Sequence, residues 1–146
     1  MMINKDYMYM SIDYGVSKIG FAIGQLIKKK ATPLKIIYNG KKGTNWIDIE
    51  KLIHEWKPNV IIIGYPYSKT KSNFTKKLDL FITMITKKYV DSIQIAKFSE
   101  VLSTEESKVI YSDMRKSQYN IKKKVDLDDL SASIILESWF NENMIR

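Results

Sequence analysis

The sequence predicts an α/β fold in which a mixed five-stranded sheet carries helices on both faces. Three short strand-like segments open the chain and are joined by short turns, which favours an antiparallel meander. Helical and strand-like segments then alternate, as is typical of crossover units with parallel strands. The predicted order is β-β-β-α-β-α-β-α-α, in a single domain over residues 1–146.

Each predicted strand is bounded by a turn signal or by a change of hydrophobic period. Gly15 ends the first strand, and Asn39-Gly40 ends the third. The fourth is a continuous β-branched run, which indicates a strand buried on both faces. The five strands are expected at 9–14, 19–24, 33–38, 59–64 and 92–97.

Apolar residues at helical spacing predict the helices between and after these strands. The four are expected at 46–56, 74–89, 103–115 and from about 126 onward, with a polar loop at 117–124. Trp46, Trp56 and Trp139 lie on apolar stripes and are expected in the core, whereas His54 is expected at the surface.

The amino-acid composition excludes several kinds of active site and favours one class of partner. The 146 residues contain no cysteine, which excludes disulfides, thiolate zinc sites and a cysteine nucleophile. A single histidine, His54, makes a histidine-based triad improbable. The formal net charge of +8 favours a polyanionic partner. No segment is typical of a leader or a membrane span, so we expect a soluble cytoplasmic protein without a membrane partner.

Acidic residues stand at the ends of predicted elements. Asp13 lies near the end of the first strand, Glu100 follows the fifth, and Asp128 begins the final helix beside Asp126 and Asp129. Carboxylates gathered at one sheet edge need a cation, and hard oxygen ligands suit Mg²⁺ or Mn²⁺. Each acid also has a structural explanation: a strand end, a solvated loop, and favourable charge at a helix N-terminus.

Four motifs in order resemble one known family. They are the segment 11–24, which contains Asp13-Tyr14-Gly15 and Gly20; the segment 61–66 with Gly64-Tyr65-Pro66; Glu100 to Glu106; and Asp128 to Ser138. Together they are similar to the YqgF family, also called RuvX, of Holliday-junction-resolvase-like proteins and pre-16S rRNA nucleases.

The resemblance implies an RNase H-like fold and a metal-dependent endoribonuclease that processes the 5′ end of precursor 16S rRNA. It implies that Asp13, Glu100 and Asp128 are catalytic acids that bind Mg²⁺ or Mn²⁺, with Asp126 as the alternate for Asp128. Precursor rRNA or a pre-ribosomal particle is the implied partner, and we expect a monomer or a weak dimer.

Basic and aromatic residues near the presumed site are candidate contacts to nucleic acid. Lys18 occupies the place of a common basic residue of the family, and Tyr65 is a candidate for base stacking. The remaining candidates follow a strand or precede the acidic helix, and are Lys69, Lys71, Lys122, Lys123 and Lys124.

One departure from the family pattern keeps alternative functions open. Val101 stands where the family usually has an arginine that could contact phosphate. A catalytically weak or inactive RNA-binding factor for ribosome assembly is therefore one alternative, and a nuclease for DNA junctions is another.

Overall fold

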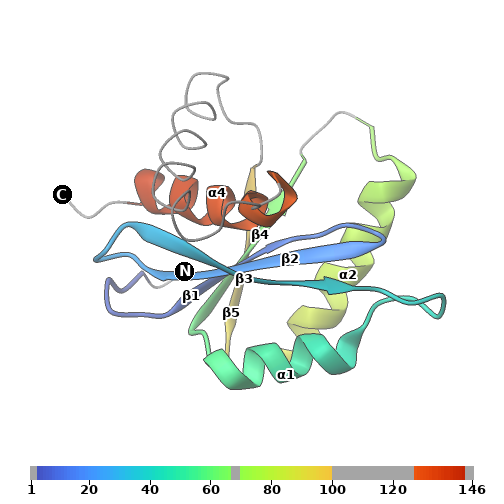
Figure 1. Cartoon of the computed structure of the whole chain (residues 1–146), viewed down its shortest axis with the longest axis horizontal. Coiled ribbons are helices and arrows are strands. Elements are labelled where there is room, and N and C mark those ends of the chain that lie inside the picture. The colour runs from blue at the N-terminus through green and yellow to red at the C-terminus, as the bar shows by residue number, and fades with distance from the viewer. Residues whose placement is uncertain (1–2, 67–69, 100–126, 144–146) are drawn as a thin grey trace.

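The computed structural model describes residues 3–66, 70–99 and 127–143 of the chain. Figure 1 shows the elements β1 (Tyr9–Asp13), β2 (Lys18–Gln25), β3 (Lys30–Tyr38), α1 (Trp46–Trp56), β4 (Val60–Tyr65), α2 (Asn73–Tyr89), β5 (Gln94–Ser99) and α4 (Leu127–Glu142). The predicted helix at 103–115 and loop at 117–124 lie outside the described residues.

The five strands form one mixed sheet in the order β3-β2-β1-β4-β5. The β1, β2 and β3 strands pair antiparallel, whereas β1, β4 and β5 run parallel, so the predicted mixed sheet is confirmed. In register, Ile12 lies beside Ile63, and Tyr65 beside Ser99. The carboxyl ends of β1, β4 and β5 therefore meet at one edge, which we call the catalytic edge after the acids that the sequence predicts there.

The bounds of β3 and β5 differ most from the sequence prediction. The β3 strand begins at Lys30 rather than 33, because Pro33 lies on an outer strand next to a shift in register, where its missing N–H is tolerated. The β5 strand runs from 94 to 99 rather than from 92 to 97, because the Ser92 and Ile93 N–H groups donate to the Tyr89 carbonyl at the end of α2.

Helices cover both faces of the sheet, as expected. The α1 and α2 helices pack on one face and α4 on the other (Figure 1). The β1 side chains alternate accordingly: Met10 and Ile12 join the core under α1 and α2, whereas Tyr9 joins the core under α4. All six residues of β4 are buried, which confirms a strand covered on both faces.

The structure tests the expectations for single aromatic and histidine residues. Trp139 is buried and His54 is exposed, as predicted. Trp46 is half-buried and stacks on Phe81, with ring centroids 5.1 Å apart. The prediction for Trp56 is wrong: it is the last residue of α1 and is 38% exposed. No helix among the described residues is long and apolar enough to cross a membrane.

Gly15 closes the turn between β1 and β2 and has no room for a side chain. A Cβ at this position would lie 2.4 Å from the Lys18 carbonyl oxygen, whereas a Cβ at Gly40 would meet nothing within 4 Å. We predict that Gly15→Ala lowers the free energy of unfolding by about 1–3 kcal/mol through overpacking. Urea denaturation measures this, with Gly40→Ala as the control that leaves stability nearly unchanged. Equal stability of the two variants would contradict the close approach.

Candidate active site

Asp13 is the last residue of β1 and stands at the catalytic edge. It is half-buried and pairs in register with Gly20 of β2, a residue without a side chain. Because side chains alternate along a strand, Asp13 is directed to the same face as Ser11 and Tyr9, which is the α4 face. The next residue, Tyr14, is directed to the other face, where its ring lies 4.9 Å from that of Phe81.

The α4 helix runs antiparallel to β1, and three contacts fix its direction. The Ser11 hydroxyl donates to the Ala132 carbonyl near the start of α4. At the beginning of β1, the Tyr9 ring lies 4.9 Å from Trp139 and 5.6 Å from Phe140, near the end of α4. The amino end of α4 therefore lies toward the carboxyl end of β1, and the first turn of α4 is directed toward the catalytic edge.

Asp128 is the second residue of α4, so its backbone belongs to this first turn. The placement of its side chain lies outside the description, as do Glu100 and Asp126. Ser99, the residue immediately before Glu100, ends β5 at the same edge. Within residues 3–66, 70–99 and 127–143, no three histidine or acidic side chains form a group that could hold a metal.

The chemistry of the predicted donors fits a hard divalent cation. The predicted ligands are all carboxylates, the chain has no cysteine, and His54 lies on α1 on the other side of the sheet. Oxygen-only donor sets favour Mg²⁺ or Mn²⁺ over Zn²⁺. Asp13, Glu100 and Asp128 are therefore suitable residues to hold such an ion.

Of the predicted nucleic-acid contacts, Lys18 and Lys71 fall in the described part of the chain. Lys18 is the first residue of β2 and is half-buried. Lys71 is exposed, and its Nζ lies 2.9 Å from Oδ2 of Asp79 on α2. Lys69, Lys122, Lys123 and Lys124 lie outside the described residues.

The position of Tyr65 does not fit its predicted role as a stacking platform. Its side chain is in the core under α1 and α2 and is only 5% exposed. Its hydroxyl donates to Oδ1 of Asp79 at 2.7 Å, and the Lys97 ammonium lies 4.8 Å from the ring centroid. Tyr65 is the last residue of β4, whereas the sequence prediction ended that strand at Gly64.

The Asp79 carboxylate connects the end of β4 to the segment that follows it. Hydrogen bonds from the Tyr65 hydroxyl and the Lys71 ammonium hold the pKa of this carboxyl below its usual value. The same pair raises the pKa of Lys71. Asp79 thus fixes Lys71 against α2 while leaving its side chain accessible.

Asn39 is a connecting residue that the sequence marked only as part of a turn. Its side-chain amide donates to the Val16 carbonyl at 2.9 Å, and its backbone N–H donates to the Ser17 carbonyl at 2.9 Å. Its Oδ1 accepts from the Asn45 N–H at 3.0 Å. Asn39 therefore joins the turn after Asp13 to the end of β3 and to the start of α1.

Two cavities lie away from the catalytic edge. One of about 550 Å³ is lined by Asn59, Val90, Gln94 and neighbouring residues at the amino ends of β4 and β5. A second, of about 520 Å³, lies beside it and is lined in part by His54 and Lys57. Neither includes a predicted catalytic residue.

The lowered pKa of Asp79 predicts a pH-dependent contribution to stability. A depressed carboxyl pKa contributes stability above the unfolded value of 3.8, and the contribution is lost as the pH falls through the lower folded value. We expect the free energy of unfolding to fall less for Asp79→Asn than for the parent when the pH is lowered from about 6 to 3. The difference should be under about 1 kcal/mol, because the Lys71–Asp79 pair is partly exposed. Urea denaturation at both pH values measures this, and identical pH dependence would contradict it.

Comparisons of the sequence with families and with known proteins show what the chain is similar to. The family model RuvX, described as Holliday junction resolvase, matches residues 7–142. A Buchnera aphidicola protein named "Putative pre-16S rRNA nuclease" is 35% identical over 91% of this chain and 97% of its own length. A Francisella tularensis protein of the same name is 32% identical over 92% of this chain and 96% of its own.

Solved structures share the fold at low sequence identity. Thermus thermophilus RuvC in complex with a Holliday junction substrate has a TM-score of 0.66 at 10% identity, covering 94% of this chain and 96% of that one. The fowlpox virus Holliday junction resolvase has a TM-score of 0.63 at 17% identity, covering 94% of this chain and 99% of that one. The predicted RNase H-like architecture is thereby confirmed. On the strength of the family match and its relatives, the chain belongs to the RuvX (YqgF) family of nucleases.

Proposed function

We propose that this nuclease is a metal-dependent endoribonuclease that processes the 5′ end of precursor 16S rRNA. The observation that carries the proposal is the antiparallel path of α4 across β1, fixed by the bond from Ser11 to Ala132. This path directs the helix turn that contains Asp128 toward the sheet edge where Asp13 ends β1. The names of the sequence relatives support the choice of substrate.

Asp13, Glu100 and Asp128 would hold Mg²⁺ or Mn²⁺, with Asp126 as the alternate for Asp128. When bound, the metal supplies a water of lowered pKa and stabilises the leaving oxygen of the phosphodiester. The protein contributes the rigid placement of Asp13, because its strand is paired on both sides and its turn is closed at Gly15.

Basic residues near the catalytic edge would hold the phosphates on either side of the cut. Lys18 begins β2, whose residue Gly20 pairs with Asp13, and Lys71 is held against α2 by Asp79. Lys69 and Lys122 to Lys124 are further candidates from the sequence. Contacts of this kind position the RNA and do not read its sequence.

We predict that Asp13→Asn reduces cleavage of a precursor-rRNA oligonucleotide in Mn²⁺ by at least about 100-fold, because removal of a metal ligand costs more than removal of its supporting partners. The measurement is the single-turnover cleavage rate. Asp91→Asn is the matched control, since Asp91 is exposed in the turn before β5, at the opposite end of the sheet. If Asp13→Asn cuts as fast as Asp91→Asn, the assigned metal site is wrong.

Binding and cleavage measured on the parent and on Asp13→Asn separate the alternatives that Val101 leaves open. RNA binding that persists in chelator and in Asp13→Asn, without cleavage by the parent protein, would indicate a binding factor for ribosome assembly. Faster cutting of four-way DNA junctions than of precursor rRNA would indicate a junction nuclease. Cleavage of rRNA that requires both metal and Asp13 supports the proposal.

A further inference from the structure

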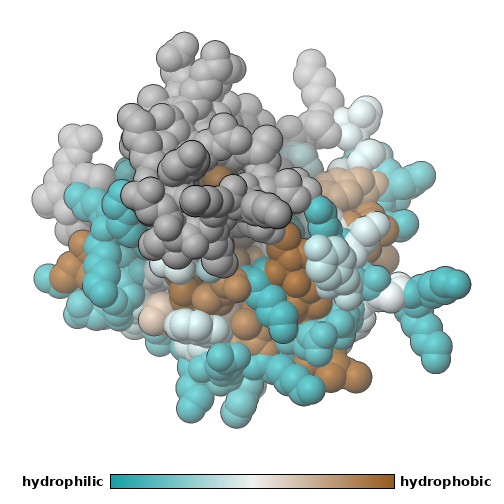
Figure 2. Space-filling view, viewed as in Figure 1, coloured by the Kyte–Doolittle hydropathy of each residue, from teal (hydrophilic) through white to brown (hydrophobic). Residues whose placement is uncertain are grey.

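The positive charge of the chain is concentrated in one hairpin. Residues 18–42, which we call the lysine hairpin, contain seven lysines and no aspartate, glutamate or arginine, against a net charge of +8 for the whole chain. This segment forms β2, β3 and their flanking loops, and β3 is an outer strand of the sheet. Figure 2 shows hydrophilic side chains at both ends of the hairpin.

Tyr38 is an exposed aromatic residue at the end of this outer strand. It is 66% exposed, while the other tyrosines in the described part of the chain are buried or half-buried. Tyr38 pairs in register with Lys18, so the two side chains share a face. Lys18 lies two residues from Gly20, the partner of Asp13, and this face is therefore also the face of Asp13.

The distance from Asp13 to Tyr38 is short enough for one strand of RNA to reach both. The two residues are two strands apart and two positions apart along the strands. Standard sheet spacings then give about 12 Å between their Cα atoms. A nucleotide strand lying at Asp13 can continue directly over Tyr38.

The backbone under Tyr38 is fixed by the contacts of Asn39 and Asn45. The Asn45 side-chain amide donates to the Tyr38 carbonyl at 3.3 Å, and Asn39 binds the turn that follows Asp13. A ring on such a fixed backbone loses little conformational freedom when a base stacks on it, which favours binding.

A lysine-rich outer strand also has a simpler explanation, because lysines prevent pairing between exposed sheet edges. The lysines here extend beyond the strand, into the turn before it and to Lys41 and Lys42 after it. In the turn, Lys29 has a φ of 53°, a conformation that costs most side chains about 1 kcal/mol relative to glycine. Protection of the strand edge does not require a lysine at that strained position.

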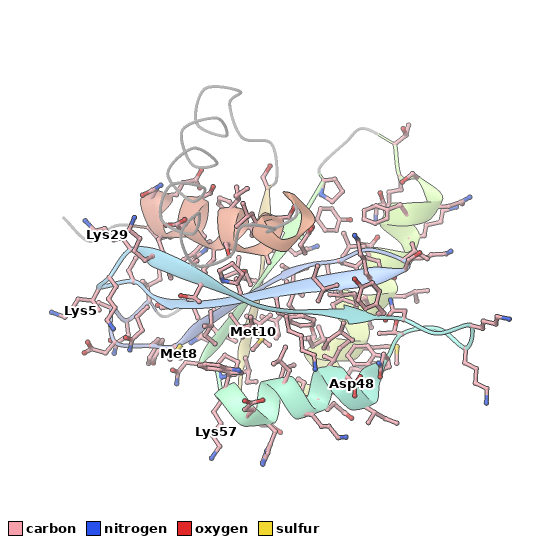
Figure 3. All side chains as sticks on the ribbon, in the orientation of Figure 1. Lys5, Met8, Met10, Lys29, Asp48 and Lys57 are labelled. Carbon is pink, nitrogen blue, oxygen red and sulfur yellow. The ribbon has the colours of Figure 1, made fainter. Side chains whose placement is uncertain are left out.

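The lysines of the turn are also available to a ligand. Lys28, Lys29 and Lys30 are exposed, and the ion pairs formed within residues 3–66, 70–99 and 127–143 involve Lys71 and Lys88 instead. Figure 3 shows Lys29 at the end of the sheet, with its side chain directed outward.

We propose that the lysine hairpin is a binding surface for single-stranded RNA, in which Tyr38 stacks on a base and the lysines contact phosphates of the strand that leads away from Asp13. The choice of RNA rests on the proposed function, but binding at this surface requires neither metal nor cleavage. Stacking with adjacent basic side chains is a general mode of single-strand recognition.

The first test is the affinity of the full chain for a fluorescein-labelled single-stranded RNA of 20 nucleotides in EDTA, measured by fluorescence anisotropy. We expect Tyr38→Ala to weaken binding by about 5- to 100-fold, as for the loss of one stacked base. Tyr38→Phe should retain binding, because it keeps the ring. Leu80→Ala, at a residue 65% exposed on α2, is the control for loss of an exposed apolar side chain. Equal affinity of Tyr38→Ala and the parent would overturn the stacking role.

The second test uses two lysines with the same backbone strain. Lys29 and Lys57 both have positive φ, and Lys57 lies after α1, outside the hairpin (Figure 3). Glycine at either position removes one charge and relieves the strain, so neither variant should unfold more easily. Lys29→Gly should make the negative slope of log association constant against log salt concentration shallower by about 0.7. Lys57→Gly should leave this slope unchanged. Equal slopes for the two variants would show that the charge acts only diffusely and would overturn the proposal.

A duplex RNA of the same sequence distinguishes stacking from general attraction to phosphate. Tyr38→Ala should weaken binding of the single strand and not of the duplex, whose bases are already stacked; equal losses would overturn the assigned mode. These binding measurements are independent of cleavage. Cleavage lost in Asp13→Asn with unchanged binding in Tyr38→Ala would contradict this inference alone, whereas normal cleavage in Asp13→Asn would contradict the proposed catalytic function alone.

Discussion

The close packing of α4 on β1 is the constraint on which the candidate site depends. Ser11 and Ala132 meet through a hydrogen bond, and Ala22, the neighbour of Ser11 in register, is fully buried. Small side chains at these positions allow the helix to approach the strand. Farther along, a Cβ at Gly24 would lie 3.1 Å from the Phe140 ring, so bulk is excluded there as well. The direction of α4, and with it the end of the sheet that its first turn approaches, follows from this fit.

The two faces of the sheet carry cores of different size. The face under α1 and α2 contains the larger apolar core and the bonds from Tyr65 and Lys71 to Asp79, which stabilise the end of β4. The other face carries Asp13, Gly20 and Ser11, which are small or polar residues in otherwise apolar strands. The alternation along β1 thus puts Asp13 on the α4 face, beyond Tyr9 and Ser11, which pack against α4.

The sequence predicted the order of the elements well because hydrophobic periodicity records which faces are buried. It could not predict exposure at the ends of elements, because periodicity does not show whether the last residue of a helix or strand is covered by a neighbouring element. Tyr65 was expected after β4 and belongs to its last buried position, whereas Trp56 was expected in the core and lies at the exposed end of α1. The sequence also did not indicate Tyr38 as a candidate contact, because only its pairing with Lys18 shows that it shares the face of Asp13. The carboxylate site stays a prediction for Asp13 as well as for Glu100, Asp126 and Asp128.

Under the proposed binding mode, the charges of the lysine hairpin would complement those of the predicted acidic site. Outside residues 18–42 the chain has 17 basic and 16 acidic residues, because seven of the 24 basic residues lie within the hairpin. The rest of the protein is therefore almost neutral in sum, and the excess positive charge lies in β2, β3 and the turns at their two ends. A cluster of carboxylates repels phosphate until a cation neutralises it. Binding energy gained on the hairpin, away from the reacting bond, can offset that repulsion and bring the phosphodiester to the metal. The lysine hairpin and the acidic site would thus act together because their charges are opposite.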